Sequence, residues 1–207
     1  MPSECLLINP QDPDLRSKVD SIAKTPGICT FIDITGSTQM KCSGIREWVA
    51  RIHNCFANAT AFMPHTCTPL KSIGDALMYY IEEGDLQRSG YSPLQVFHGL
   101  WQLATETGQE FPNVKIGAAW CDEAYPITFF PGSRDYYGID IDMTARLQSL
   151  AASREVVIDS RLRDKVVADY QRAGNASDFG SVERLVGPEN APPLKGIARN
   201  VVIYRAR

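Results

Sequence analysis

The order in which two hydrophobic periodicities alternate along the chain is the strongest constraint on its fold. The segment GICTFIDI, residues 27–34, is short, rich in β-branched and aromatic residues, and bounded by Pro26 and Gly36, which predicts a buried strand. Apolar residues then recur at helical spacing, so we expect a helix over residues 43–60. The residues that carry this spacing are Ile45, Trp48, Val49, Ile52 and Phe56.

The segments that follow continue the alternation. TPLKSIGDALMYYIEE indicates two strands that meet at Gly74-Asp75, a pair that favours a tight hairpin turn. Residues 92–107 open with a capping pattern, Ser-Pro-x-Gln, that predicts a second helix, and NVKIGAAW at 113–120 indicates a strand. The resulting order, strand, helix, strand, strand, helix, strand, predicts an α+β fold with a ferredoxin-like or polymerase-palm βαββαβ core.

A C-terminal extension follows this core. We expect a helix at 140–151, a strand at 155–158, a short helix at 160–168 and a last strand at 200–206. Residues 171–193 are rich in Gly, Asn, Ser and Pro and predict a hairpin and loop.

The length of the chain sets its domain organisation. A chain of 207 residues has room for one sizeable core, so we divide it into an N-terminal segment, residues 1–26, and a single domain, residues 27–207. Within the N-terminal segment, DPDLRSKVDSIAK could form a short helix that lies across the sheet.

Composition excludes several classes of protein. The chain is 44% hydrophobic and 22% charged, as in ordinary soluble proteins, and it shows neither a signal peptide nor an apolar run of about 18 residues. We therefore expect a cytoplasmic protein without a membrane partner, in which the six cysteines, none at Cys-x-x-Cys spacing, are free thiols. A net charge of −3 predicts no nucleic-acid partner, although it allows a small charged substrate that brings its own metal.

Two carboxylates stand at predicted bends that should lie side by side. Asp33 comes at the end of the first strand and Asp75 in the hairpin that follows, and these elements are neighbours in a βαββαβ sheet. Two adjacent carboxylates repel each other unless a cation lies between them, and a divalent metal that shares its shell with substrate phosphates takes such oxygen ligands. The other interpretation is that Asp33 caps a turn and Asp75 fills a hairpin position that favours Asp.

The turn after Asp33 adds a second polar feature. Thr35, Gly36, Ser37 and Thr38 place backbone amides at the start of the next helix, which is a natural site for the distal phosphates of a nucleotide.

Four separated motifs carry a resemblance to a known family. FIDITGST, LKSIGDALM, DYYGIDIDMTARL and LKGI resemble, in order and spacing, the catalytic domain of class III nucleotide cyclases, over about residues 27–205. The resemblance implies the class III cyclase fold and a phosphorus–oxygen lyase that converts a nucleoside triphosphate into a 3′,5′-cyclic nucleotide and pyrophosphate. It also implies a head-to-tail homodimer, with the metal aspartates from one chain and the base and arginine residues from the other.

The resemblance also implies a role for each matching position. Asp33 and Asp75 would hold two ions of Mg²⁺ or Mn²⁺, with the Ile34 carbonyl as a further ligand. The remaining implied positions are the base contacts Lys71 and Asp135, the α-phosphate contact Arg146 and the terminal-phosphate contact Lys195. For Arg146 the alternative is a helix-surface salt bridge, and for Lys195 and Asp135 it is a solvated loop charge.

One position departs from the family. Asp142 stands where most members carry an asparagine that orients the ribose, and a carboxylate cannot donate as an amide does. No sensor or membrane module accompanies the motifs. Such a form is similar to the bacterial pyrimidine cyclases of antiphage (Pycsar) systems, whose cyclic UMP or cyclic CMP activates a separate effector. We therefore expect UTP or CTP as substrate. A smaller pyrimidine would leave room for a bulky wall residue such as Phe31 or Tyr79, whose rings the sequence does not place.

Other functions stay open. Lys71 and Asp135 also suit a purine, so an adenylate or guanylate cyclase is the first alternative. A non-catalytic nucleotide-binding or dimerisation module is the second. A palm polymerase or diguanylate cyclase is disfavoured, because the sequence has no Gly-Gly-acidic-acidic-Phe signature and no basic face for a template.

Overall fold

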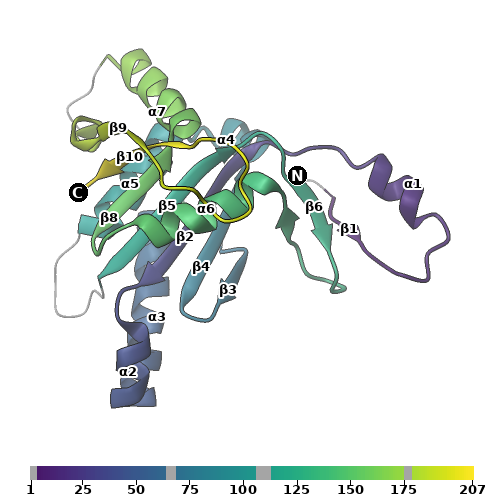
Figure 1. Cartoon of the computed structure of the whole chain (residues 1–207), viewed down its shortest axis with the longest axis horizontal. Helices are drawn as coiled ribbons and strands as arrows, with labels where there is room; N and C mark the ends of the chain where they lie inside the picture. The colour runs from purple at the N-terminus through teal and green to yellow at the C-terminus, as the bar shows by residue number, and fades with distance from the viewer. Residues whose placement is uncertain (1–3, 64–68, 106–112, 175–178) are drawn as a thin grey trace.

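The computed structural model describes residues 4–63, 69–105, 113–174 and 179–207, and Figure 1 shows them as one mixed sheet with helices on both faces. The sheet has seven strands in the order β3-β4-β2-β5-β8-β10-β9, beside a smaller sheet in the order β1-β6-β7. The strands of the large sheet are β2 (Gly27–Ile34), β3 (Lys71–Ile73), β4 (Ala76–Glu82), β5 (Val114–Cys121), β8 (Glu155–Asp159), β9 (Val186–Asn190) and β10 (Val202–Ala206). Those of the small sheet are β1 (Leu6–Leu7), β6 (Tyr125–Thr128) and β7 (Tyr136–Tyr137).

The predicted α+β architecture is confirmed. The sheet contains the βαββαβ core, in which β2 lies between β4 and β5 and pairs antiparallel with both. The helices of this core are α2 (Ser37–Ser43), α3 (Ile45–Phe62), α4 (Glu83–Ser89) and α5 (Pro93–Thr105). The helix expected at 43–60 forms as α3, which begins at Ile45 and ends at Phe62. A separate short helix, α2, comes directly after the turn that follows β2 and meets α3 at Gly44.

The capping pattern of α5 forms as the sequence predicts. The Ser92 amide donates to Gln95 Oε1 at 2.9 Å, and the Gln95 amide donates to Ser92 Oγ at 3.4 Å. The expected residues 106 and 107 of this helix lie outside the described residues.

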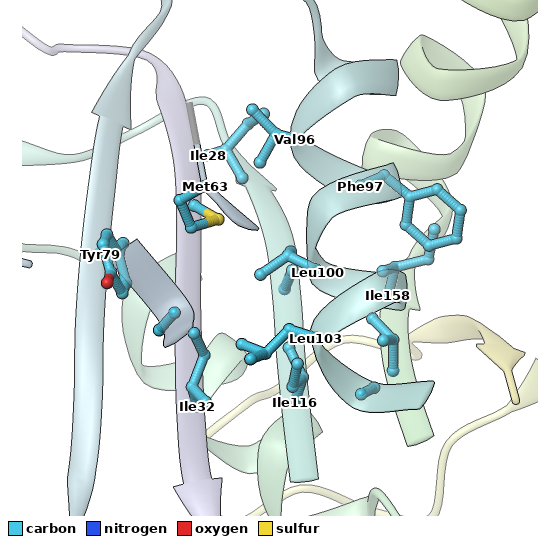
Figure 2. Close-up of a cluster of buried hydrophobic side chains, with 14 of the residues drawn as sticks. Ile28, Ile32, Met63, Tyr79, Val96, Phe97, Leu100, Leu103, Ile116 and Ile158 are labelled. Carbon is cyan, nitrogen blue, oxygen red and sulfur yellow. The ribbon is translucent and has the colours of Figure 1, made fainter. Parts of the chain in front are cut away.

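One face of the large sheet carries the main hydrophobic core (Figure 2). Helices α3, α5 and α7 (Ser160–Arg172) pack their apolar side chains against alternate residues of the central strands. α3 and α5 come close at Gly99, where an added Cβ would lie 2.2 Å from the Phe62 carbonyl oxygen. Residues of this core are Ile28, Ile32, Met63, Tyr79, Val96, Phe97, Leu100, Leu103, Ile116 and Ile158.

A single long helix, α6 (Ile139–Leu150), covers the opposite face. Its buried side chains join two smaller apolar clusters, one with Cys29 and Phe31 of β2 and one with Ala119 of β5. The helix lies directly on β5 at Gly117, where an added Cβ would be 2.2 Å from the Gln148 amide nitrogen. Alternation along β2 places Asp33 on this same face, two residues after Phe31.

The C-terminal extension completes the sheet. β8 joins β5 in parallel, and β10 enters antiparallel between β8 and β9. The helix expected at 160–168 continues to Arg172, and Asp159 caps its start by accepting from the Leu162 amide at 3.1 Å. In the described part of residues 171–193, where a hairpin and loop were predicted, the structure has a 3₁₀ turn, Val182–Arg184, and one strand, β9. The partner of β9 is the separately predicted last strand, β10.

The N-terminal helix forms, but its predicted position is wrong. α1 (Leu15–Asp20) has no buried residue and projects beside β1, away from the large sheet (Figure 1). Its six residues, LRSKVD, offer only two large apolar side chains, too few for a stripe that could pack across strands. The part of the segment that does pair with the body is β1, which lies parallel to β6.

No helix within the described ranges combines the length and hydropathy needed to cross a membrane. The five described cysteines are free thiols, as predicted, and Cys67 lies outside the described residues.

Candidate active site

The register of β2 and β4 brings the two predicted metal carboxylates together. Asp33 pairs directly with Ala76, the residue that follows Asp75 in the turn between β3 and β4. Their side chains are 21% and 22% exposed, respectively, so both carboxylates are open to a ligand from solvent.

Each carboxylate already faces a lysine ammonium. Lys115, directly across from Asp33 on β5, places Nζ 3.2 Å from Asp33 Oδ2, and Gln148 of α6 donates Nε2–H to the same oxygen at 3.2 Å. Asp75 accepts from the Ser37 hydroxyl, and Lys41 Nζ lies 4.0 Å from Asp75 Oδ1. The lysines compensate the two negative charges that a bound cation would otherwise balance.

The donors at this end of the sheet fit a hard divalent cation. Within the described ranges no group of three or more His, Cys, Asp or Glu side chains could hold a metal by itself. Two carboxylates and one backbone carbonyl suit Mg²⁺ or Mn²⁺ that takes its other ligands from substrate phosphates and water. The Thr35 hydroxyl, next to the predicted Ile34 ligand, is buried and has no hydrogen-bond partner among the described residues, so it could accept or donate to a ligand here.

The Gly-Ser-Thr turn after β2 is hydrogen-bonded at its first residue, Thr35, to the residue that precedes β5. The Thr35 amide donates to the Asn113 carbonyl at 2.8 Å, so this amide is not available to a phosphate. Gly36 adopts a left-handed conformation, φ 76°, and Ser37 and Thr38 open α2. Of the four residues in the predicted anion site, only the last three keep amides at the start of the helix.

The two predicted base contacts meet in one chain. Lys71 Nζ lies 2.7 Å and 2.6 Å from the two carboxylate oxygens of Asp135, and both side chains are largely shielded from solvent. The Tyr136 amide also donates to Asp135 Oδ1, at 2.8 Å, and the Tyr137 ring lies beside Lys71, with 5.7 Å from Nζ to the ring centroid. Asp135 is thus not a solvated loop charge; it is half of a donor–acceptor pair beside an aromatic ring.

The predicted contacts to the ribose, Asp142, and to the phosphates, Arg146 and Lys195, lie on or beside α6. Asp142 and Arg146 are exposed one turn apart on the helix, and Lys195 is exposed in a turn whose flanking residues, Leu194 and Ile197, pack against the α6 cluster. In the described part of the chain, none of these three charged side chains forms an ion pair, so the surface salt bridge considered for Arg146 is not formed. All three are available to a ligand or a second chain.

A buried charge network under α6 escaped the sequence analysis. Asp140 is 1% exposed and accepts from the Asp122 amide at 3.1 Å, from Arg161 Nη2 at 2.8 Å and from Arg199. Burial alone would raise the pKa of Asp140, but the hydrogen bonds and charges of the two arginines outweigh it and lower the pKa. For Asp159, which also pairs with Arg161, burial prevails and raises the pKa. The sequence did contain one indication of this network: Asp140 is a charged residue on the face of the predicted helix that carries its apolar residues.

The two aromatic wall candidates lie on opposite faces of the sheet. Phe31 packs on the α6 face and shares a row of paired residues with Met78 and Lys71. Tyr79 is fully buried in the core on the other face (Figure 2), because successive strand residues alternate in direction. Of the two candidates, only Phe31 can therefore form a wall of the base pocket.

Comparison with known proteins identifies the fold. No protein-family model and no curated protein sequence matches the chain. Solved structures do match over nearly the whole chain. The adenylyl cyclase CyaB from P. aeruginosa is 14% identical with a TM-score of 0.64, covering 90% of this chain and 96% of CyaB. The guanylyl cyclase Cya2 is 16% identical with a TM-score of 0.66, covering 89% and 93%.

A third structure was solved with a nucleotide. It is the guanylate cyclase domain of RhGC from Catenaria anguillulae in complex with GTP, 15% identical with a TM-score of 0.60, covering 89% of this chain and 97% of that domain. At these identities the likeness establishes the fold, which is that of the class III cyclase catalytic domains.

Proposed function

We propose that the protein is a nucleotide cyclase that converts a nucleoside triphosphate into a 3′,5′-cyclic nucleotide and pyrophosphate. One observation carries the proposal: on a cyclase fold, the β2–β4 register sets Asp33 beside the turn that holds Asp75. The Lys71–Asp135 pair on the neighbouring strand β3 and loop supports it, because a donor and an acceptor held together suit the edge of a nucleobase.

The residues divide the chemistry between them. Asp33, Asp75 and the Ile34 carbonyl would hold two ions of Mg²⁺ or Mn²⁺, which lower the pKa of the ribose 3′-hydroxyl and take up charge on the leaving pyrophosphate. Arg146 offers a planar fork of donors to the α-phosphate, which a lysine cannot match. Lys195 and the amides of Gly36, Ser37 and Thr38 would bind the terminal phosphates.

We infer a head-to-tail homodimer from the exposed charges and apolar side chains near the site. Asp142, Arg146 and Lys195 face outward, where they can reach a nucleotide held by the aspartates of a second chain. Large apolar side chains are exposed on the loop after β6, at the end of β7 and at the start of α6, and such exposure is typical of interaction surfaces. They are Phe129, Phe130, Tyr137 and Ile139.

For the base, we propose a pyrimidine, UTP or CTP. Phe31 lies on the site face in the same row as Lys71, where its ring would limit the room for a base. Asp142 takes the place of the asparagine that is usual in the family. The product, cyclic UMP or cyclic CMP, would act as an antiphage messenger on a separate effector protein. An adenylate or guanylate cyclase is the alternative, since Lys71 and Asp135 can also pair with a purine edge.

Competition among substrates tests both the cyclase activity and the preference for a pyrimidine base. The purified protein is incubated with equal concentrations of ATP, GTP, CTP and UTP and Mn²⁺, and the cyclic products are measured by mass spectrometry. We expect one dominant cyclic pyrimidine, because a hydrogen-bonding pocket that matches its base can reject another by up to about 10⁴-fold. Dominant cyclic AMP or cyclic GMP would overturn the base assignment and keep the cyclase. Nucleotide binding without any cyclic product would favour the non-catalytic module.

A further inference from the structure

The N-terminal segment is attached to the body by a short strand. β1 pairs in parallel with β6, with Leu6 opposite Ile127 and Leu7 opposite Thr128. The Ile8 amide extends the pairing by donating to the Thr128 carbonyl at 2.8 Å. Residues 5–8 therefore form one edge of the small sheet seen beside the main sheet in Figure 1.

This small sheet leads directly to Asp135. β6 pairs antiparallel with β7, whose first residue, Tyr136, follows Asp135 in the chain. Cys5, just before β1, also places its thiol 3.6 Å from the Asp135 carbonyl oxygen, within the range of a weak sulfur hydrogen bond. The N-terminal strand thus approaches Asp135 through β6 and β7 and by a direct contact.

The other side of Asp135 is held by β4. The Tyr136 ring stacks on Tyr80, with 4.1 Å between centroids, and its hydroxyl donates to the buried Glu82 carboxylate. Arg134 pairs with the same carboxylate at 3.1 Å. The Tyr80 hydroxyl in turn donates at 2.5 Å to the carbonyl of Thr25, where the N-terminal segment ends.

The segment between these two attachments is loosely packed. The Thr25 amide donates to the Ala124 carbonyl at 2.8 Å, but α1 in the middle buries no residue. A hollow of about 470 Å³ opens among residues of the segment itself, and one of about 450 Å³ opens between the segment and residues 82–84 of the body. Its hold on the body is therefore concentrated at two places, Cys5–Ile8 along β6 and Thr25 next to Ala124 and Tyr80.

We propose that residues 5–8 are a positioning element that fixes Asp135 against Lys71 and thereby sets the base preference, an inference that rests on the proposed cyclase function. In this proposal the segment acts on the nucleotide only through Asp135. Its effect passes through β6 and β7 and through the contact of Cys5 with the Asp135 backbone. Discrimination by a hydrogen-bonding pocket depends on donors and acceptors that stay in place, so a looser Asp135 accepts the wrong base more readily.

A substitution that removes the Ile8 amide tests the proposal. Ile8→Pro loses the donor to Thr128, and Val19→Pro, which breaks α1 instead, is the matched control. Each full-length variant is given the four triphosphates in competition. Because the ratio of products does not depend on how much protein is folded, it reports positioning separately from stability. We expect the ratio of the preferred to the next product to fall about tenfold in Ile8→Pro and to stay unchanged in Val19→Pro. An unchanged ratio in Ile8→Pro overturns the proposal.

A second measurement does not require activity. Hydrogen exchange of the Tyr136 amide, which donates to Asp135, should quicken in Ile8→Pro while that of Ile203 in the main sheet does not. If the unmodified protein makes no cyclic product, the proposed function fails and the exchange rates decide the positioning role alone. Unchanged exchange at Tyr136 overturns that role whatever the activity. Should Ile8→Pro not fold, Leu6→Gly weakens the same strand and is judged by the same two measurements.

Discussion

The two faces of the large sheet are built on opposite plans. Helices α3, α5 and α7 close one face with apolar side chains, and Ile28 and Ile32 of β2 point into that core. On the other face α6 is the one helix that the described residues form, and Phe31 and Asp33 of the same strand point toward it. Alternate residues of one strand therefore have two roles. Ile28 and Ile32 stabilise the fold, and Phe31 and Asp33 contribute to the proposed site.

The two faces also differ in whether they contain charged side chains that are partly exposed to solvent. Asp33 and Asp75 keep about a fifth of their side chains exposed and face lysines that are themselves partly exposed. Moderate exposure keeps the cost of desolvating these carboxylates small, whereas an unpaired charge in the closed face would cost several kcal/mol. We therefore expect substitutions on the face covered by α6, the open face, to alter activity. Substitutions on the face covered by α3, α5 and α7, the closed face, should alter stability.

The largest effect is expected at the metal carboxylates. Asp33→Ala or Asp75→Ala should lower kcat at least about 10³-fold, because each removes a ligand that the cations need. Circular dichroism and product chromatography are the measurements. Asp85→Ala removes an aspartate that is ion-paired on α4, away from this face, and is the control expected to keep full activity. Substantial turnover by either site variant would remove the two-metal assignment.

On the closed face the effect should fall on stability. Phe97 is fully buried, and Phe97→Ala should cost about 3–5 kcal/mol of unfolding free energy by leaving a cavity. Phe130 is 72% exposed, so Phe130→Ala, the same change on the open side, should cost no more than about 0.5 kcal/mol. Denaturant titration of both variants measures the contrast. Equal losses would mean that the open side is packed as firmly as the closed one.

A second copy of the chain is the expected cover for the open face. Inactive Asp33→Ala and inactive Arg146→Ala chains, mixed and allowed to exchange, should regain about a quarter of the unmodified activity. This follows because half of the dimers are then mixed and each of those has one intact site. Each variant incubated alone is the control. No recovery, with mixed dimers confirmed by mass spectrometry, would place the whole site within one chain.

The buried charge under α6 should give a smaller, pH-dependent effect. Asp140→Asn should lose roughly 1.5–3 kcal/mol of stability at about pH 7, because the arginines lose a charged partner. The folded-state pKa of Asp140 is lowered from 3.8, so its contribution is complete above that value and disappears as the pH falls through the lowered pKa. Denaturant titration of both proteins across that range should show the difference shrinking in acid. Equal stability at about pH 7 would contradict the assignment.

Much of the framework could be predicted from local pattern. Alternation, helical spacing and turn residues locate every strand of the core, and β2 has the predicted bounds of 27–34. The adjacency of Asp33 and Asp75 followed as well, because hairpin geometry and βαββαβ topology together leave few registers. The resemblance gave Lys71 and Asp135 as base contacts, but it did not predict that their side chains touch, and nothing local joins residues so far apart in the chain.

What the sequence did not predict depends on long-range contacts. β1, β6 and β7 have two to four residues each, too few for a periodicity, and their pairing joins the first residues of the chain to the middle. Asp140 could be placed in a helix but not against Arg199, which approaches from the loop before β10. The predicted position of α1 was wrong for a different reason. Local sequence favours a helix here, but six residues carry too few apolar side chains to pack the helix against the sheet.

The distance in sequence between β2 and its partners also implies a delay during protein synthesis. Gly27 pairs with Glu82 on one side and Cys121 on the other, and Asp33 finds Gln148 only 115 residues further along the chain. A ribosome adding about 5–20 residues per second needs on the order of ten seconds to cover that separation. Ala76 and Lys115 are added during that interval, and Gln148 is the last of these neighbours of Asp33 to be synthesised. Newly made protein should therefore acquire a formed site late in synthesis, well after the strand that carries the aspartate has left the ribosome.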